Sequence, residues 1–389
     1  MCKCRLELQR QVARYCESGS RQPTVVNEQL PCRVPEKHIT HIPVLARETV
    51  QALQPKDGQI YFDTTFGGGG HSKHLLATQK DIRVITMDRD PTAYERSVKL
   101  SLVDERVVPL LGRFSEFPTL FKRIGISHGS LHGVIIDLGP SAFQLDDEQR
   151  GFSHQLNGPL DMRMDGNRFP NMATAADVIN TLDSVSLSKI FKIYGEEKYA
   201  KKFAQSIIDL RFMMKSIKTT SELSQLINAV CHDMIVQEDG PTNAARKVFQ
   251  ALRIFVNNEI NELNYTLEHI HTYLAFDPKV TALQRVQEYE RIEIEETLKA
   301  GKISVVTSHS LEDRIVKRHL TAINIDDPIT QNISQKMINS LEVATMEEID
   351  RLKNRKWLPI TRHVVKPTEE EVLTNVRSQT AKLRTAVRL

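Results

Sequence analysis

A glycine-rich loop is the segment of this 389-residue chain whose composition most strongly suggests chemistry. Residues 63–71 read Asp-Thr-Thr-Phe-Gly-Gly-Gly-Gly-His and follow a short apolar run. Glycines let a backbone approach a ligand closely and adopt positive φ. The dinucleotide-binding pattern, with glycines at its first, third and sixth positions, fails because Ser72 occupies the sixth. The loop therefore suits a nucleoside that carries an amino-acid tail, and a simple tight turn is the alternative interpretation.

An acidic residue follows the next apolar run. Asp88 comes after residues 84–87, and an acid at the end of this strand accepts hydrogen bonds from both ribose hydroxyls of an adenosine ligand. Its alternative role is that of a surface carboxylate in the turn 88–91. Phe114, after the third run, is either a residue that packs on an adenine ring or an ordinary core residue. Together these features favour S-adenosylmethionine, a nucleoside with an amino-acid tail.

The fourth apolar run ends at Asp137, where amino-methyltransferases usually carry catalytic residues. A conjugated amine is a weak nucleophile. Hydrogen-bond acceptors must therefore draw its lone pair out of the ring, while both reactants are held aligned and shielded from water. A carboxylate is sufficient, so Asp137 is the candidate catalytic residue, with loop capping as its alternative. His71 and His74 have no third ligand nearby, so no metal site is predicted.

These side chains need a sheet to position them. The four apolar runs are continuous rather than alternating, which is typical of parallel strands covered by helices on both faces. The runs lie at residues 60–62, 84–87, 107–111 and 134–136, with helical stretches at 72–78 and 91–102. After Asp137 apolar residues recur at helical spacing until a further strand at 303–306. The sequence therefore predicts an α/β, doubly wound sheet with an inserted helical domain.

Composition and charge narrow the remaining possibilities. No uncharged apolar stretch approaches the roughly 18 residues of a membrane span, so no membrane partner is predicted. The net charge is +3, but residues 351–389 hold ten Lys or Arg against three Glu, either to follow phosphates or as a solvated face. Four of the five cysteines lie in the first 32 residues, which favours a reducing compartment. The basic first 37 residues suggest an organelle-targeting segment or a disordered N-terminus.

Five further motifs carry a family resemblance. They lie at residues 41–45, 158–165, 194–201, 246–257 and 308–318, and begin His-Ile-Pro-Val-Leu, Gly-Pro-Leu-Asp, Tyr-Gly-Glu-Glu, Arg-Lys-Val-Phe and Ser-His-Ser-Leu. With the loop at 63–71, they make the chain resemble the ribosomal RNA small subunit methyltransferase H family from about residue 41 to its end. The eukaryotic branch that it resembles is the mitochondrial methyltransferase-like 15 group.

The resemblance implies a Rossmann-like class I methyltransferase fold and N4-methylation of a cytosine in small-subunit ribosomal RNA. The implied partner is that RNA or the assembling small ribosomal subunit, in mitochondria or otherwise in the cytoplasm, and the oligomeric state stays open. The implied contacts of the cofactor, S-adenosyl-L-methionine, are made by Gly68, Gly69, Gly70, His71, Asp88, Phe114, Asp137 and Gln144. The expected domains are an N-terminal extension at 1–40, a methyltransferase domain at 41–145 and 245–389, and a helical substrate-binding domain at 146–244.

The chain departs from the family pattern close to Asp137. Pro140 and Ala142 replace a valine and a serine, and Ser308 replaces an aromatic residue before His309. These changes leave open a second function, that of a catalytically weakened ribosome-assembly factor that binds the cofactor and ribosomal RNA. A methyltransferase of DNA or protein is a third alternative. The tetrapeptide with two prolines and an aromatic residue, usual in DNA amino-methyltransferases, is absent after Asp137, which disfavours a DNA substrate.

Overall fold

The chain forms two compact units, which we describe from a computed structural model. The structure describes residues 43–213, 215–233, 241–280, 299–321, 355–360 and 363–389. Predictions about the N-terminal extension at 1–40 therefore concern residues outside these ranges. The sheet unit comprises Ile42–Gly139 and Ile260–Leu389, and the helical unit comprises Pro140–Glu259.

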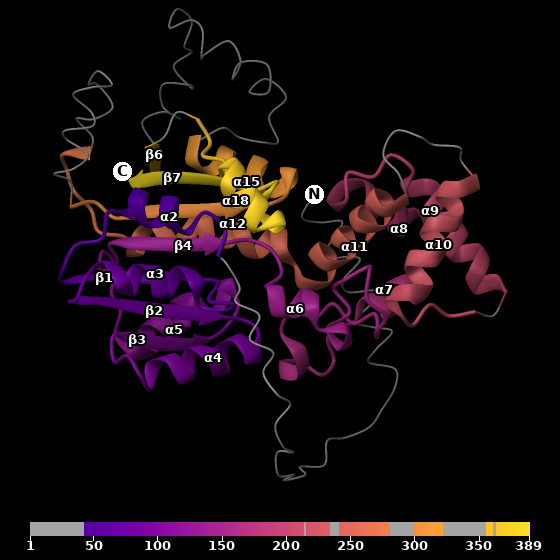
Figure 1. Cartoon of the computed structure of the whole chain (residues 1–389), viewed down its shortest axis with the longest axis horizontal. Coiled ribbons are helices and arrows are strands. Elements are labelled where there is room, and N and C mark those ends of the chain that lie inside the picture. Colours follow the sequence, from indigo (N-terminus) through magenta and orange to yellow (C-terminus); the bar gives the residue numbers. More distant parts are fainter. Residues whose placement is uncertain (1–42, 214, 234–240, 281–298, 322–354, 361–362) are drawn as a thin grey trace, which may run out of the picture. The chain divides into compact units, whose positions relative to one another are not determined.

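Seven strands of the described residues form one sheet in the order β3-β2-β1-β4-β5-β7-β6 (Figure 1). Their bounds are Gln59–Asp63 (β1), Ile82–Asp88 (β2), Val107–Leu111 (β3), Gly133–Asp137 (β4), Lys302–Thr307 (β5), Trp357–Pro359 (β6) and Lys382–Arg388 (β7). The first five strands are parallel, whereas β7 is antiparallel to β5 and β6. The chain runs outward from β1 to β3 and then crosses to β4, so strand order reverses between β1 and β4. Ligands bind at the carboxyl ends of strands at such a reversal. The prediction of a doubly wound α/β sheet is confirmed.

Both faces of the sheet are buried, because neighbouring strand residues point into different apolar clusters. In β1, Tyr61 belongs to the cluster on one face and Phe62 to the cluster on the other; in β2, Val84 and Ile85 divide in the same way. The face of Tyr61 is covered by α2 (Ala46–Leu53), α3 (Gly70–Thr78) and α4 (Pro91–Ser101). The face of Phe62 is covered by α5 (Phe117–Ile124), α12 (Glu259–His269) and α15 (Ser310–Thr321). Burial on two sides explains why the apolar runs in the sequence do not alternate.

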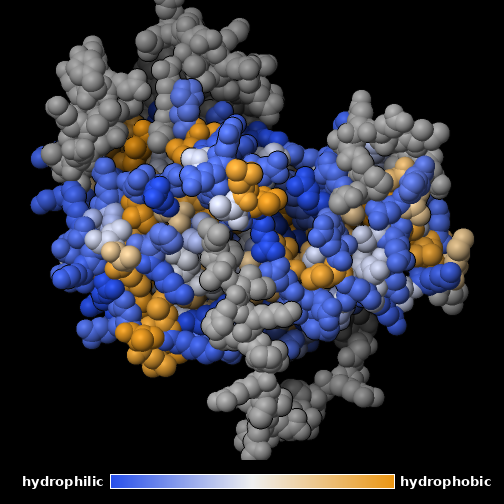
Figure 2. All heavy atoms as spheres, in the orientation of Figure 1, coloured by the Kyte–Doolittle hydropathy of each residue, from blue (hydrophilic) through white to orange (hydrophobic). Residues whose placement is uncertain are grey.

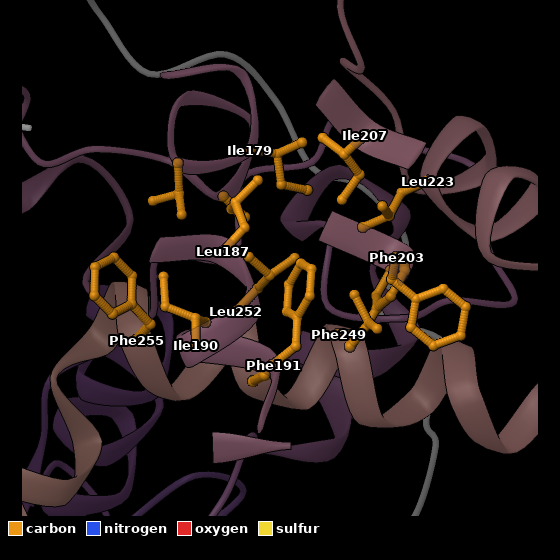
Figure 3. Close-up of a cluster of buried hydrophobic side chains, with 14 of the residues drawn as sticks. Ile179, Leu187, Ile190, Phe191, Phe203, Ile207, Leu223, Phe249, Leu252 and Phe255 are labelled. Atoms are coloured by element: carbon orange, nitrogen blue, oxygen red, sulfur yellow. The ribbon is translucent and has the colours of Figure 1, made fainter. Parts of the chain in front are cut away.

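The helical unit has an apolar core of its own. Its helices are α6 (Ala142–Asp146), α7 (Ala175–Thr181), α8 (Ser184–Tyr194), α9 (Ala200–Phe212), α10 (Thr220–Asp233) and α11 (Pro241–Asn257). Figure 3 shows Phe191 of α8, Phe203 of α9 and Phe249 of α11 in this core. The insertion predicted at 146–244 lies within the unit, whose observed bounds are 140–259. The unit extends to residue 259 because α11 buries apolar side chains in this core.

Basic residues near the C-terminus are paired within the sheet unit. Asp313 of α15 accepts a hydrogen bond from Arg384 Nε at 2.6 Å and from Lys382 Nζ at 3.0 Å, both on β7. Arg388 donates to two backbone carbonyls. Two interpretations were open for the basic segment at 351–389. Phosphate binding is disfavoured for Lys382, Arg384 and Arg388, because they already bind Asp313 or backbone carbonyls.

The surface of the described residues gives no sign of a membrane-spanning element. None of their helices is both long and apolar enough to cross a bilayer. On the face drawn in Figure 2, hydrophobic residues form separate patches among hydrophilic ones.

Candidate cofactor site and active site

The glycine-rich loop connects β1 to α3 at the reversal of strand order. Two backbone hydrogen bonds tie it to both neighbouring strands. The Thr64 amide donates to the Ile135 carbonyl of β4 at 3.0 Å, and the Phe66 amide donates to the Met87 carbonyl of β2 at 3.0 Å. The loop therefore lies across the carboxyl ends of three parallel strands, where a ligand crevice is expected.

The loop requires glycine for two different reasons, backbone conformation and space. Gly67 and Gly69 have φ of 51° and 78°, in the left-handed region that favours glycine. Gly68 lies between them, and Gly70 is the first residue of α3. At Gly70 the reason is steric, because an added Cβ would lie 2.6 Å from the Cβ of Pro43.

Replacing Gly70 by alanine is expected to lower the free energy of unfolding by about 1–3 kcal/mol, because the new methyl group overlaps the Pro43 ring. Denaturant titration measures the change. The double variant Pro43→Gly with Gly70→Ala, compared with Pro43→Gly alone, is the control, since glycine removes the Cβ of residue 43 together with the rest of the ring and should restore most of the loss. An equal loss in the presence and absence of the Pro43 ring would contradict the steric explanation.

Asp63, the last residue of β1, is fully buried and holds the loop together. Its carboxylate accepts hydrogen bonds from Ser72 Oγ at 2.6 Å and from the Thr65 amide at 3.1 Å. Burial raises the pKa of Asp63, and the positive charge of a protonated His71 opposes this shift. Asp63 thus links the end of β1 to the start of α3.

Asp88 ends β2 beside the loop and is partly exposed. Its Oδ2 accepts the Gly67 amide at 2.8 Å and its Oδ1 accepts the Asp90 amide at 2.9 Å. Burial raises the pKa of Asp88 to about 7, against the opposing effect of these two amides. Each carboxylate oxygen keeps a second lone pair, so Asp88 can still accept two hydroxyl donors. This acceptor chemistry fits the ribose of an adenosine ligand.

Asp137 ends β4 on the other side of the loop. Its backbone amide donates to Thr65 Oγ1 at 2.8 Å, so the loop fixes the position of this strand end. Its side chain is 27% exposed, and Oδ2 lies 3.9 Å from His71 Nδ1. Burial raises the pKa of Asp137 to about 6, and the positive charge of a protonated His71 opposes the shift. The structure therefore gathers Asp88, Asp137 and His71 around the loop.

Phe114 follows β3 and lies on a segment that is held beside Asp88. The Gly112 amide donates to the Asp88 carbonyl at 2.9 Å. Glu262 of α12 accepts from the Ser115 amide at 2.7 Å and from Ser115 Oγ at 3.0 Å. Phe114 itself packs against the core on one side and is only partly buried. An exposed part of the ring is thus compatible with the predicted contact with adenine.

Replacing Glu262 by alanine is expected to weaken S-adenosylmethionine binding roughly tenfold, because the segment that carries Phe114 loses its fixed position. Isothermal titration calorimetry measures this affinity. Glu268→Ala is a matched control on the same helix, since that carboxylate is 53% exposed and pairs with Lys356 at the surface. Equal affinities of the two variants would argue against a role of Glu262 in holding Phe114.

Gln144 belongs to the helical unit. It is buried, and its Oε1 accepts the Ser141 amide at 2.9 Å in a capping box at the start of α6. This is a local structural role, and contact with the cofactor stays a prediction for Gln144.

The sequence analysis did not identify Thr65, Ser72 or Glu262 as site residues. Thr65 and Ser72 lie on either side of the glycines, so the sequence could have identified their hydroxyl groups as candidate hydrogen-bonding partners in the loop. Glu262 lies 147 residues from its partner Ser115, and no local pattern marks it.

Three strand-terminal carboxylates beside a glycine-rich loop, on a sheet with five parallel strands and an antiparallel β7, are the arrangement of a Rossmann-like class I methyltransferase. Comparison with protein families gives the same class, since the MraW methylase family matches residues 38–285 and 281–389. The chain belongs to the MraW methylase family.

Individual relatives carry names from the same family. The chain is 39% identical, over 90% of its length and 83% of the relative's, to the 12S rRNA N(4)-cytidine methyltransferase METTL15 of Bos taurus. It is 37% identical, over 90% of its length and 89% of the relative's, to the ribosomal RNA small subunit methyltransferase H of Parvibaculum lavamentivorans. It is also 39% identical, over 90% of its length, to a Culex quinquefasciatus protein named as the receptor-type tyrosine-protein phosphatase mosPTP-1, but it spans only 22% of that protein. The predicted family resemblance is confirmed.

Proposed function

We propose that this protein transfers a methyl group from S-adenosyl-L-methionine to the N4 amine of a cytosine in small-subunit ribosomal RNA. The observation that carries the proposal is the position of Asp88 and Asp137 on either side of the glycine-rich loop, at the reversal of strand order. The names of the bovine and bacterial relatives support the cytidine and the ribosomal RNA. The branch resemblance supports a mitochondrial location, and the assembling small subunit is the proposed partner.

Binding and chemistry divide between the two carboxylates. When bound, the cofactor supplies an electrophilic methyl group on a sulfonium sulfur. Asp88 would hold the ribose, while the loop at Gly67–Gly70 lets the backbone approach the ligand. The partly exposed Asp137 carboxylate would accept a hydrogen bond from the amine N–H, which draws the lone pair out of the pyrimidine ring. The same oxygen can receive the proton that the amine loses after methylation.

The target base must leave its stack to reach such a site. We assign RNA positioning to the helical unit, where exposed lysines lie on and between α8 and α9 at positions 189, 192, 198, 201 and 202. Binding through these charges should weaken as salt rises, because phosphate contacts release counterions.

The test is to incubate the protein with small-subunit ribosomal RNA and S-adenosylmethionine labelled on its methyl group. The RNA is then digested and its nucleosides are separated by mass spectrometry. We expect label in N4-methylcytidine. Label in another nucleoside, or in protein, would replace the proposal with a different methyltransferase activity. Binding of cofactor and RNA without transfer of label would favour the ribosome-assembly alternative.

A further inference from the structure

His71 is held by a carbonyl that leaves it a single free ring nitrogen. The residue is 4% exposed, and Nε2 lies 3.0 Å from the Val44 carbonyl oxygen. A carbonyl oxygen only accepts, so Nε2 must carry a hydrogen whatever the charge of the ring. Nδ1 is therefore the ring nitrogen that can face another side chain.

The free nitrogen faces the proposed active site. His71 Nδ1 lies 3.9 Å from Asp137 Oδ2, which is an ion-pair distance and too long for a hydrogen bond. Two carboxylates interact electrostatically with His71, Asp63 at the end of β1 and Asp137 at the end of β4. Asp63 is already engaged by Ser72 Oγ and the Thr65 amide. Asp137 is the carboxylate that remains for Nδ1.

The turn that supplies the Val44 carbonyl is itself fixed. The Leu45 amide donates to Glu371 Oε1 of α18 (Glu369–Thr374) at 2.8 Å. Leu45 has φ of 52°, and its buried side chain packs in a separate apolar cluster. A non-glycine residue in this conformation persists only where its surroundings hold it. Val44 and Leu45, which end the motif singled out in the sequence without a role, therefore provide a rigid acceptor behind His71.

We propose that His71 is a positioning residue that orients the Asp137 carboxylate through Nδ1 while the Val44 carbonyl fixes Nε2. With a hydrogen on Nδ1, His71 donates toward one Asp137 oxygen and leaves the other oxygen for the incoming amine. The inference rests on the proposed methyl transfer to an amine.

Two substitutions separate the two nitrogens of His71. In His71→Asn the side-chain amide stands in for Nδ1 and keeps a donor toward Asp137, whereas in His71→Gln it stands in for Nε2 and keeps only the bond to Val44. We expect kcat to fall less than about fivefold in the asparagine variant and roughly 100-fold in the glutamine variant, because orientation of the reacting group is lost. Cofactor affinity, from calorimetry, should change by the same factor in both variants, because each loses the cofactor contact that the family resemblance implies for His71.

The matched control is His74, one turn further along α3, which is exposed and whose Nδ1 contacts the Gly70 carbonyl. His74→Asn and His74→Gln should behave alike and close to the wild-type protein. Higher activity in His71→Gln than in His71→Asn would overturn the proposal and leave His71 with an anchoring role alone. So would parallel losses of cofactor affinity and kcat.

A measurement without RNA keeps the inference testable if methyl transfer to ribosomal RNA is not the activity, or if a His71 variant does not fold. In nitrogen NMR spectra of the wild-type protein and of Asp137→Asn, the Nδ1 resonance of His71 should differ while the Nε2–H signal stays in place. An unchanged Nδ1 resonance would show that Asp137 and His71 are not coupled. This result is independent of the substrate, so its failure is distinct from failure of the proposed function.

Discussion

Replacing Asp88 by alanine is expected to lower the affinity for S-adenosylmethionine roughly 100-fold. The carboxylate would accept two ribose hydroxyls, and each hydrogen bond to a charged group contributes about 1.5–3 kcal/mol. Two such bonds correspond to at least a factor of 100 in the dissociation constant. Calorimetry with the cofactor, and with its demethylated product, measures the loss directly.

Two controls keep this result interpretable. Asp88→Asn retains one oxygen for the Gly67 amide and should lose less affinity than the alanine variant. Asp104→Ala removes a carboxylate that pairs with Arg106 before β3, at the opposite edge of the sheet, and should leave affinity unchanged. A folded Asp88→Ala protein with wild-type affinity would remove Asp88 from the cofactor site, and with it the main support for a nucleoside ligand.

The pH dependence of binding gives a further check on Asp88. Burial raises its pKa to about 7, so the carboxylate is largely ionised only above that pH. The ionised form accepts from both hydroxyls, whereas the protonated form loses acceptor capacity to its own hydrogen. Affinity should therefore fall as the pH drops through 7, and Asp88→Asn should show little of this dependence.

The parallel part of the sheet was predictable from the sequence because strands that are buried on both faces consist of continuous apolar runs. Runs such as 84–87 contain no alternation, and each ends in a residue that breaks the apolar pattern. The antiparallel strands β6 and β7 were missed. β6 spans only Trp357–Pro359, and β7 reads Lys-Leu-Arg-Thr-Ala-Val-Arg, so its charges suggested a solvated segment. Asp313, which pairs with Lys382 and Arg384 of β7, lies about 70 residues earlier in the chain. Only folding brings these side chains together.

The same difference separates the predictable and unpredictable parts of the site. Asp88 and Asp137 were identified because each follows a strand, and parallel strands bring their ends to one edge of a sheet. The partners that hold them were not, because these contacts depend on side-chain geometry across loops. Glu262, which accepts from Ser115, lies in no motif that was recognised, and the motif that contains Val44 does not indicate that its carbonyl faces His71.

The second large effect is expected in Asp137→Asn, which should lower kcat roughly 100- to 1,000-fold while cofactor affinity stays within about threefold of the wild-type value. Asparagine keeps the shape of the side chain but cannot receive the amine proton, and its NH2 group competes with the amine as a donor. Single-turnover transfer of labelled methyl groups to ribosomal RNA measures the step. Wild-type kcat should rise as the pH increases through about 6, the pKa to which burial raises Asp137, and then level off. The asparagine variant should lack this rise.

Stability should move in the opposite direction to activity at this position. Burial raises the pKa of Asp137 from its ordinary value, so the folded state binds this proton more tightly than the unfolded state does. The resulting stabilisation is complete below the unfolded pKa and is lost as the pH rises through about 6, where a partly buried negative charge appears. At pH 8 the neutral asparagine should therefore leave the free energy of unfolding unchanged or raise it. A variant that is as stable as the wild-type protein and yet nearly inactive identifies a carboxylate kept for chemistry rather than for folding. A large loss of stability instead would assign Asp137 to loop capping, its alternative role.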